Sequence, residues 1–205
     1  MEFYEAVDRR RTVREWTDED VSAEVLERII SAGMKAPTHN HRRDWEFIIL
    51  HTPQEKETAL QFVKAWSVTQ EENKIISSMA SAAQKMYAYA MPRQYTMLAS
   101  APYVIIPLFP GGDRIFRAAA VNGLNSFATA WCVVENIFLA AAAEGLGYAM
   151  RIPVGEEGRN VTSALGVPDG YIMPCYIGIG HALETAYTVE QMRREVKSAL
   201  HYGRF

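Results

Sequence analysis

The first feature that could do chemistry is a cluster of four arginines within six residues: Arg9, Arg10, Arg11 and Arg14. Like charges so close together repel one another unless an anion lies against them. The whole chain has a net charge of −3, so the positive charge is local. A guanidinium binds phosphate oxygens in pairs and stays charged at any working pH. The cluster therefore indicates a small anionic ligand, with a solvated charged face as the alternative.

A second polar segment lies further along the chain. Residues 36–45 read APTHNHRRDW and are followed by the apolar run Phe47–Leu50. The segment thus connects the end of an expected helix to the start of an expected strand. Its proline, hydroxyl, amide and imidazole groups can serve as ligand contacts, because binding residues concentrate in such loops.

Together the two segments resemble the signature of the FMN-dependent nitroreductase family. The family's first motif, Arg-Arg-Ser-x-Arg-x-Phe, is matched by residues 10–16 (RRTVREW). Its second, Ala-Pro-Ser followed by polar residues and Pro-Trp, is matched by residues 36–38 and Trp45, with Asp44 in place of the usual Pro. Residues 140–147, 165–168 and 176–180 resemble its central-helix end, its late loop and its last core strand. The resemblance covers nearly the whole chain in the right order.

The resemblance implies FMN as the cofactor and NAD(P)H as the transient electron donor. Arg10 would bind the phosphate, and Arg11 and Thr12 would contact the ribityl chain or the ring edge. Arg14 would lie near N1 and O2, where a fixed cation stabilises the negative charge of the reduced flavin. A surface ion pair with a neighbouring carboxylate is the alternative for Arg14. No catalytic side chain is implied, since the flavin performs the redox chemistry.

The polar loop would reach across a dimer interface to the partner's flavin, through Pro37, Thr38 and Asn40. His41 and His39 lie beside them and could be ring donors, proton sources, substrate contacts or simply solvated groups. An ion pair of Asp44 with Arg42 or Arg43 is a further local alternative.

Further along, the backbone amide of Ile152 is the candidate donor to the flavin N5, because Pro153 cannot donate. Arg151 is either a second ring cation or an outward-facing charge. The family often has a base shortly after its last strand, yet none occurs here between His181 and Arg193. Either the arginine cluster binds the phosphate alone or Arg204 assists.

Helices and strands mix without regular alternation, so the fold class is α+β. The pattern predicts helices over 2–9, 23–35, 52–65, 118–144, a short one ending at 165–166, and 188–200. It predicts strands over 45–51, 103–109, 148–152 and 171–180. The chain 1–205 reads as a single domain with a helical excursion around 68–98 that could cover the active site. The resemblance implies a nitroreductase-like fold with a central mixed or antiparallel sheet surrounded by helices.

The helical pattern over 118–144 is apolar nearly all round, and such a helix must be buried on every side. A domain of this size has limited interior for it, so we expect a subunit interface. That expectation coincides with the intertwined homodimer that the resemblance implies.

Composition narrows the class of protein. The two cysteines, Cys132 and Cys175, lie in apolar stretches and read as buried thiols in a reducing compartment. We expect no metal site, no nucleic-acid partner and no membrane partner, because no ligand spacing, basic excess or signal peptide is visible. The expected location is cytoplasmic.

The sequence thus predicts an FMN-dependent NAD(P)H oxidoreductase that reduces nitroaromatics, quinones or related small-molecule acceptors by a ping-pong mechanism. One alternative is a reductive dehalogenase-like flavoprotein of the same fold, whose lid bears Glu, Tyr and Lys. Residues 91–100 match that lid poorly, since Arg93 is their only base. The other alternative is a non-catalytic flavin-binding dimer. The acceptor and the choice between NADH and NADPH are not encoded in any motif.

Overall fold

The computed structural model describes residues 1–72, 82–112, 118–189 and 194–205. Its principal elements follow in chain order: α1 (Phe3–Arg9), α2 (Ala23–Gly33), β1 (Glu46–Leu50), α3 (Pro53–Glu72), α4 (Ala82–Ala90), α5 (Thr96–Ala99), β2 (Tyr103–Pro110), α6 (Asn125–Ala143), β3 (Gly147–Arg151), α7 (Glu157–Ala164), β4 (Tyr171–Ile172) and β5 (Tyr176–Gly180). Short 3-10 turns occur at His39–His41, Val121–Leu124 and Val196–Ala199.

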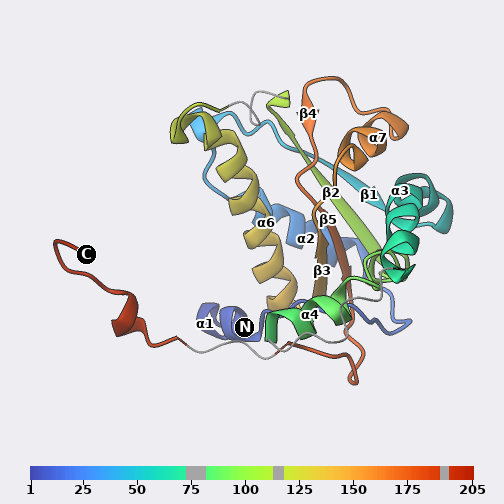
Figure 1. The fold of residues 1–205 in the computed structure, drawn as a ribbon, viewed down its shortest axis with the longest axis horizontal. Helices are drawn as coiled ribbons and strands as arrows, with labels where there is room; N and C mark the ends of the chain where they lie inside the picture. The colour runs from blue at the N-terminus through green and yellow to red at the C-terminus, as the bar shows by residue number, and fades with distance from the viewer. Residues whose placement is uncertain (73–81, 113–117, 190–193) are drawn as a thin grey trace.

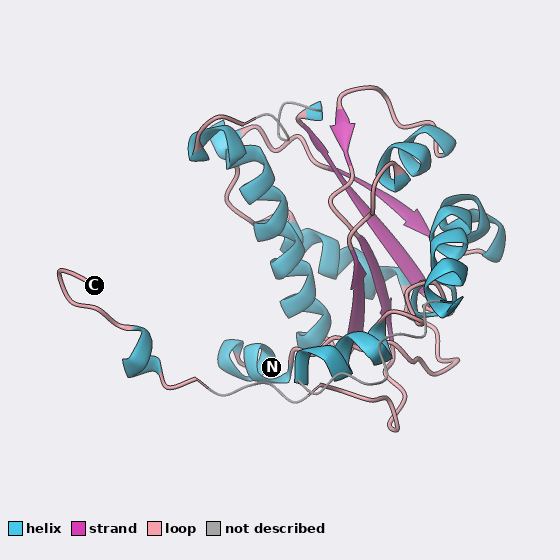
Figure 2. Ribbon diagram, in the orientation of Figure 1, coloured by secondary structure: helices cyan, strands magenta, loops and turns pink. Residues whose placement is uncertain are grey.

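The strands form one central antiparallel sheet in the order β1-β2-β5-β3, and β4 pairs with the far end of β2. Helices lie on both sides of it, with α2 and α6 against one face and α3 and α7 against the other (Figures 1 and 2). The α+β class and the antiparallel sheet are therefore confirmed.

The sheet separates two hydrophobic cores, because successive side chains of a strand point to opposite faces of the sheet. On β2, Ile105 packs with α2 and α6, whereas Val104 and Ile106 pack with α3 and α5. On β3, Tyr148 belongs to the first core and Ala149 to the second. Neighbouring residues of β3 thus pack against different helices.

Local signals fixed two helix starts. The Ser22 hydroxyl accepts a hydrogen bond from the Val25 amide, as expected for the first residue before α2. Glu55 accepts from the amides of His51 and Thr52, which forms the expected capping box before α3. The α3 helix runs beyond its expected end at 65 to Glu72.

Several expected boundaries were wrong. The predicted strand 171–180 is two strands, because Pro174 interrupts it with no amide to donate and the two halves pair with different parts of β2. The predicted helix 188–200 is absent from its described residues apart from the turn Val196–Ala199, since nothing packs there to stabilise a helix. Within 118–144, α6 begins only at Asn125. Cys132 is exposed, while Cys175 is buried and burial raises the pKa of its thiol.

By length and composition, the helix Val121–Ala143 is apolar enough to cross a membrane, and 39% of its most apolar window is buried. Its buried side packs on α2 and on the sheet. A core helix of a globular domain meets the same criterion. The remaining exposed side of α6 is taken up below.

The edge strand β3 is bordered by the segment that carries the arginines. Thr12 forms a parallel bridge with Tyr148, and the Val13 amide donates to the Tyr148 carbonyl at 2.8 Å. The close approach depends on Gly147, since a Cβ there would lie 2.9 Å from Val13 Cγ2. The arginine segment therefore lies along the outer edge of the sheet.

We predict that Gly147→Ala lowers the free energy of unfolding by about 1–3 kcal/mol, because the added methyl group overpacks this contact. Urea unfolding measures the effect. Gly158→Ala is the matched control, since its Cβ would meet Pro153 at an ordinary 3.4 Å within α7. Equal stability of the two variants would show that the arginine segment does not need the close approach.

Candidate active site

Arg10 lies beside the beginning of β3, next to the Tyr148 side chain. Its Nη1 donates to the Tyr148 hydroxyl at 2.7 Å, and its Nε lies 3.3 Å from a Glu135 carboxylate oxygen. Burial alone would lower the pKa of Arg10, but the Tyr148 hydrogen bond and the Glu135 charge outweigh it and raise the pKa. The Tyr148 ring is itself held by stacking on Phe138 at 3.7 Å. Arg10 is thus a firmly placed cation whose side chain is 28% exposed.

Arg14 directly follows Val13 in the arginine segment, and among the described residues it forms no ion pair. Its side chain is largely buried, and burial followed by the nearby Arg93 charge lowers its pKa. Its Nε is buried with no hydrogen-bond partner among the described residues. The surface ion pair considered for Arg14 is therefore wrong. A desolvated guanidinium with an unused donor is costly unless something anionic binds it.

The other two arginines face away from this edge. Arg9 forms an exposed ion pair with Glu5 at 2.8 Å. Arg11 Nη1 donates to the backbone oxygens of Asp8 and Arg10, at 2.6 and 2.7 Å. In this arrangement Arg11 satisfies carbonyl groups at the end of α1.

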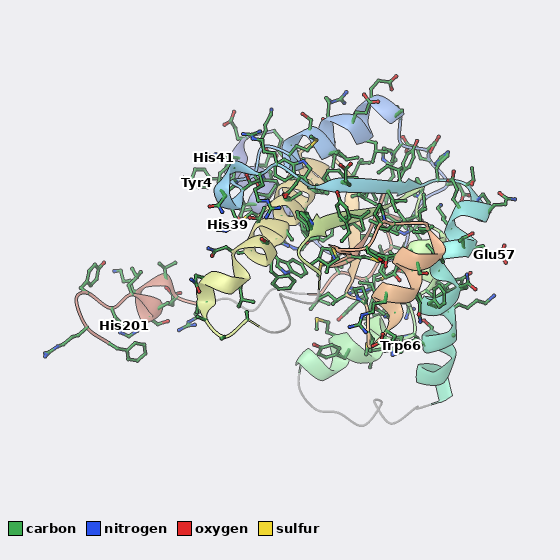
Figure 3. The ribbon with its side chains drawn as sticks, turned by 90° about the horizontal axis from the view of Figure 1, so that it is seen from above. Tyr4, His39, His41, Glu57, Trp66 and His201 are labelled. Carbon is green, nitrogen blue, oxygen red and sulfur yellow. The ribbon has the colours of Figure 1, made fainter. Side chains whose placement is uncertain are left out.

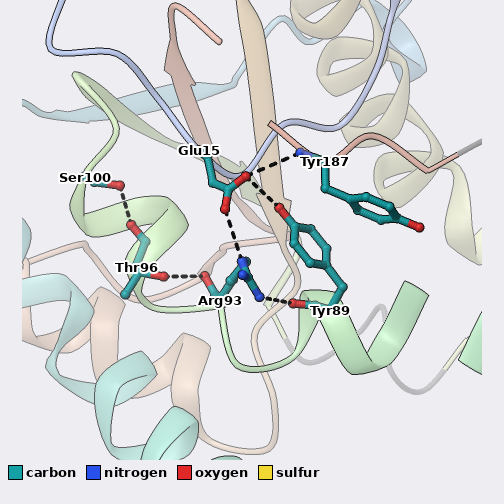
Figure 4. A network of polar contacts seen from close by, with 6 residues as sticks. All are labelled: Glu15, Tyr89, Arg93, Thr96, Ser100 and Tyr187. Carbon is teal, nitrogen blue, oxygen red and sulfur yellow. Dashed lines mark hydrogen bonds and ion pairs between the residues drawn. The ribbon is translucent and has the colours of Figure 1, made fainter. Parts of the chain in front are cut away.

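Four residues outside the sequence motifs, Tyr89, Arg93, Thr96 and Tyr187, form a network with Glu15, the neighbour of Arg14 (Figure 4). The Tyr89 hydroxyl donates to Glu15 at 3.0 Å, and Arg93 lies 3.5 Å from the same carboxylate. The Tyr89 ring contacts the Tyr187 ring in a tilted arrangement, with centroids 4.6 Å apart, and has the Arg93 guanidinium over it at 4.0 Å. Thr96 adds a hydrogen bond to the Arg93 carbonyl. The helical excursion expected around 68–98 was the sequence signal for Tyr89, Arg93 and Thr96.

The network joins the arginine segment to the predicted excursion. The described part of 68–98 is helical in α3, α4 and α5. Tyr89 comes from α4, and Arg93 lies in the turn between α4 and α5. The hydrogen bond to Glu15 and burial both raise the pKa of Tyr89, so its hydroxyl stays a donor. The excursion therefore covers Arg14 directly.

The polar loop after α2 is strained. Asn40, His41 and Arg43 all have left-handed backbone angles, with φ of 54°, 52° and 48°. Non-glycine residues seldom adopt this conformation, and such strain concentrates at ligand sites. Pro37, Asn40 and His41 are exposed, whereas Thr38 is half-buried. The expected ion pair within the loop is between Arg42 and Asp44, at 2.8 Å.

The loop is held at the start of α6. The His39 amide donates to the Thr129 hydroxyl at 3.1 Å, and Ser126 lines a small hollow beside it. Figure 3 shows His39 and His41 at this end of the molecule, far from Trp66. Within the described part of one chain, no hydrogen bond or ion pair joins the loop to Arg10 or Arg14.

A cavity of about 1090 Å3 lies beside the other end of β3. Its walls are the loop after β3 with Ile152, the α7 helix, the segment before β5, and Phe127 and Trp131 of α6. Ile152 is 54% exposed. The cavity is larger than most small-ligand sites and is bordered mainly by apolar groups, with space for a ring system.

The cavity and the polar loop lie on opposite sides of α6. Successive residues of a helix are rotated by about 100°. Phe127 and Trp131 therefore face roughly 150° away from Ser126 and Thr129. Between these two sides runs an exposed stripe of α6 formed by Ala128, Cys132, Glu135 and Ala143.

The outward-facing alternative for Arg151 was wrong. Its side chain is only 2% exposed and forms a two-point ion pair with Glu157, with Nε 3.0 Å from Oε1. The carboxylate lies six residues further along the chain, at the start of α7. The sequence could not show that these two charges face each other inside the protein.

This chain belongs to the Nitroreductase family, whose family model matches residues 7–181. Short segments are similar to curated iodotyrosine deiodinases. That of Haliscomenobacter hydrossis is 38% identical over 55 residues, covering 27% of this chain and 25% of that protein. That of Mus musculus is 35% identical over 64 residues, covering 31% and 22%. The aligned segments thus span about a quarter of the length of these relatives.

Solved structures share the fold over the whole chain. An iodotyrosine deiodinase bound to FMN and 3-iodo-L-tyrosine has a TM-score of 0.76, with 17% identity and 100% of both chains covered. An FMN- and NADPH-dependent nitroreductase from Sphigopyxis sp. strain HMH has a TM-score of 0.74, with 21% identity and 100% of both chains covered. Together with the family match, they confirm the nitroreductase-like fold.

We predict that Arg14→Met leaves the free energy of unfolding of the ligand-free protein unchanged or raises it by up to about 1 kcal/mol, because the variant removes an unsatisfied buried donor. Urea unfolding measures it. Arg93→Met is the control and should destabilise, since it removes the Glu15 ion pair and the stacking on Tyr89. A clear loss of stability in Arg14→Met would show that Arg14 serves the fold and not a ligand.

Proposed function

We propose that this protein is an FMN-dependent oxidoreductase that uses NAD(P)H to reduce nitroaromatic, quinone or related acceptors by a ping-pong mechanism. The observation that carries the proposal is Arg14, a desolvated guanidinium with an unused Nε donor. Oxidoreductase chemistry is also what the names of the family and of its structural neighbours indicate.

The residues present fit FMN. From Tyr148 to Ile152, the edge of β3 extends about 13 Å. Arg10 at its beginning would bind the phosphate, Thr12 the ribityl chain, and Arg14 the N1–O2 side of the ring. The Ile152 amide at its end would donate to N5. Arg11 could contact FMN only after breaking its hydrogen bonds to the backbone oxygens of Asp8 and Arg10. We therefore expect Arg11 to contribute least to FMN binding.

When bound, FMN supplies the two-electron transfer between nicotinamide and acceptor. The protein's own part is electrostatic. Arg14 is fixed by packing and by Tyr89 before any ligand arrives, so it stabilises developing negative charge without reorganising. Its burial strengthens that effect, because water screens it poorly there. No separate dinucleotide motif occurs in the sequence, so donor and acceptor would use the same space in turn.

We propose that two copies complete the site. The exposed stripe Ala128–Cys132–Glu135–Ala143 lies between the cavity side and the loop side of α6. A second copy packed on this stripe would place its loop, with Pro37, Thr38, Asn40 and His41, near the cavity of the first. The same contact would cover the exposed side of this apolar helix.

The C-terminal segment 194–205 supports an intertwined arrangement. It extends away from the rest of the molecule (Figure 1) and carries exposed apolar side chains, namely Val196, Leu200, Tyr202 and Phe205. Apolar groups on an extended arm lower the free energy only when another surface covers them. We propose that the partner provides that surface. The two free thiols fit a reducing compartment such as the cytoplasm.

Reductive dehalogenation is the second candidate, since the curated relatives cited above are iodotyrosine deiodinases. One structural observation favours it. Glu15, Tyr89 and Arg93 form a carboxylate, phenol and cation cluster under the excursion, although Glu15 comes from outside it. Iodide release from 3-iodotyrosine by the reduced protein, without turnover of a nitroaromatic, would favour this candidate. A flavin that NAD(P)H does not reduce would instead favour a non-catalytic flavin-binding dimer.

We predict that the purified protein binds FMN and that NADH or NADPH bleaches its visible absorption under anaerobic conditions. Arg10→Ala should weaken FMN binding about tenfold or more, through loss of charged contacts to the phosphate. Arg9→Ala is the matched control and should bind as wild type, because Arg9 pairs with Glu5 outside the site. Titration of the apoprotein measures both. Equal affinities in the two variants would remove Arg10 from the phosphate site.

We also predict a particle of twice the 23.1 kDa chain mass in light scattering. Ala128→Glu should dissociate it, because the charge would be buried against the partner. Thr58→Glu adds the same charge to the exposed side of α3 and should leave the dimer intact. A dimeric Ala128→Glu variant would rule out this face of α6.

A further inference from the structure

The ion pair between Arg151 and Glu157 is deeply buried, with side chains 2% and 5% exposed. Both Nε and Nη2 of Arg151 contact the carboxylate, and Nη1 donates to Gln94 Oε1 at 3.3 Å. The Trp66 ring lies 4.4 Å from the guanidinium carbon. A buried pair needs this many partners, since desolvation otherwise exceeds the attraction between the charges.

The pair joins four parts of the fold. Arg151 ends β3, Glu157 begins α7, Trp66 belongs to α3, and Gln94 lies in the turn between α4 and α5. Figure 3 shows Trp66 where α3, α4 and α7 come together. Tyr176 of β5 is also close, because the Glu157 charge adds to burial in raising its pKa. The pair is thus one of the places where the excursion is attached to the sheet.

The same pair closes a short loop. Residues 152–156 run from Arg151 to Glu157, so one ion pair fixes both ends of this five-residue segment. Ile152, Pro153 and Gly155 from the loop line the 1090 Å3 cavity. Two of its side chains, Ile152 and Val154, are half-exposed and make little packing of their own. The loop therefore owes its position mainly to its ends.

We propose that Arg151 and Glu157 are positioning residues that hold the 152–156 loop against the flavin and tie that loop to the excursion over Arg14. This inference rests on the proposed function, because the loop would supply the amide that contacts the flavin ring. Without the pair, the fold would persist but the loop amides would lose their fixed direction. A backbone donor helps only when it is held in place beforehand.

The test compares Arg151→Met/Glu157→Met with wild type. Replacing both charges with apolar groups of similar volume often preserves stability, whereas Arg151→Met alone leaves a buried carboxylate unpaired and should destabilise. Arg28→Met/Glu144→Met is the matched control, since it removes a similar two-point pair, at 2.9 and 2.9 Å, from the surface. Hydrogen–deuterium exchange of the ligand-free proteins is measured first, then FMN affinity by titration.

We expect the double variant to melt near the wild-type temperature, while amides of residues 152–156 exchange about tenfold faster and those of β2 and β5 do not change. FMN affinity should fall about tenfold. The control should change neither quantity. Wild-type exchange at 152–156 in a folded double variant would overturn the proposal.

If the double variant does not fold, Arg151→Lys decides, because lysine keeps the charge and lacks the planar fork. Faster exchange at 152–156 then supports the proposal, and unchanged exchange overturns it. A wild-type protein that binds no FMN would refute the proposed function. The exchange result would still decide whether the pair holds the loop.

Discussion

The pairing of the arginine segment with the outer edge of β3 is the constraint on which the site depends. One parallel bridge, between Thr12 and Tyr148, sets the register. It places Arg10 over the Tyr148 hydroxyl and directs Arg14 towards the excursion. The bridge in turn requires a residue without a side chain at position 147. A glycine in the sheet thus determines where two cations stand.

Among the described residues, two buried arginines differ in how well the protein satisfies their guanidinium groups. Arg151 is buried more deeply than Arg14, yet it has a carboxylate, an amide oxygen and an aromatic ring around it. Arg14 has the Tyr89 ring at 5.9 Å and an unused Nε. Such a contrast is expected when one cation serves the fold and the other awaits a ligand. Glu15 strengthens the distinction, because it binds Tyr89 and Arg93 and not Arg14.

What the sequence could predict was local. The helix starts predicted near 23 and 52 and the strand predicted over 103–109 depend on neighbouring residues, and the structure has them as α2, α3 and β2. The burial of Arg151 depends on Trp66 and Gln94, which are distant in sequence, so no pattern revealed it. The interruption at Pro174 was visible in principle, but the apolar run around it masked the break. The strained backbone at Asn40 likewise has no signature in residue type alone.

We propose above that Arg10 and its neighbouring arginines bind the phosphate of a flavin. Calorimetric titration of the ligand-free protein with FMN and with riboflavin, which differ only in that phosphate, tests it most directly. We predict that FMN binds at least about a hundredfold more tightly than riboflavin, and that this difference in affinity shrinks with added salt. Equal affinity for the two flavins would contradict it.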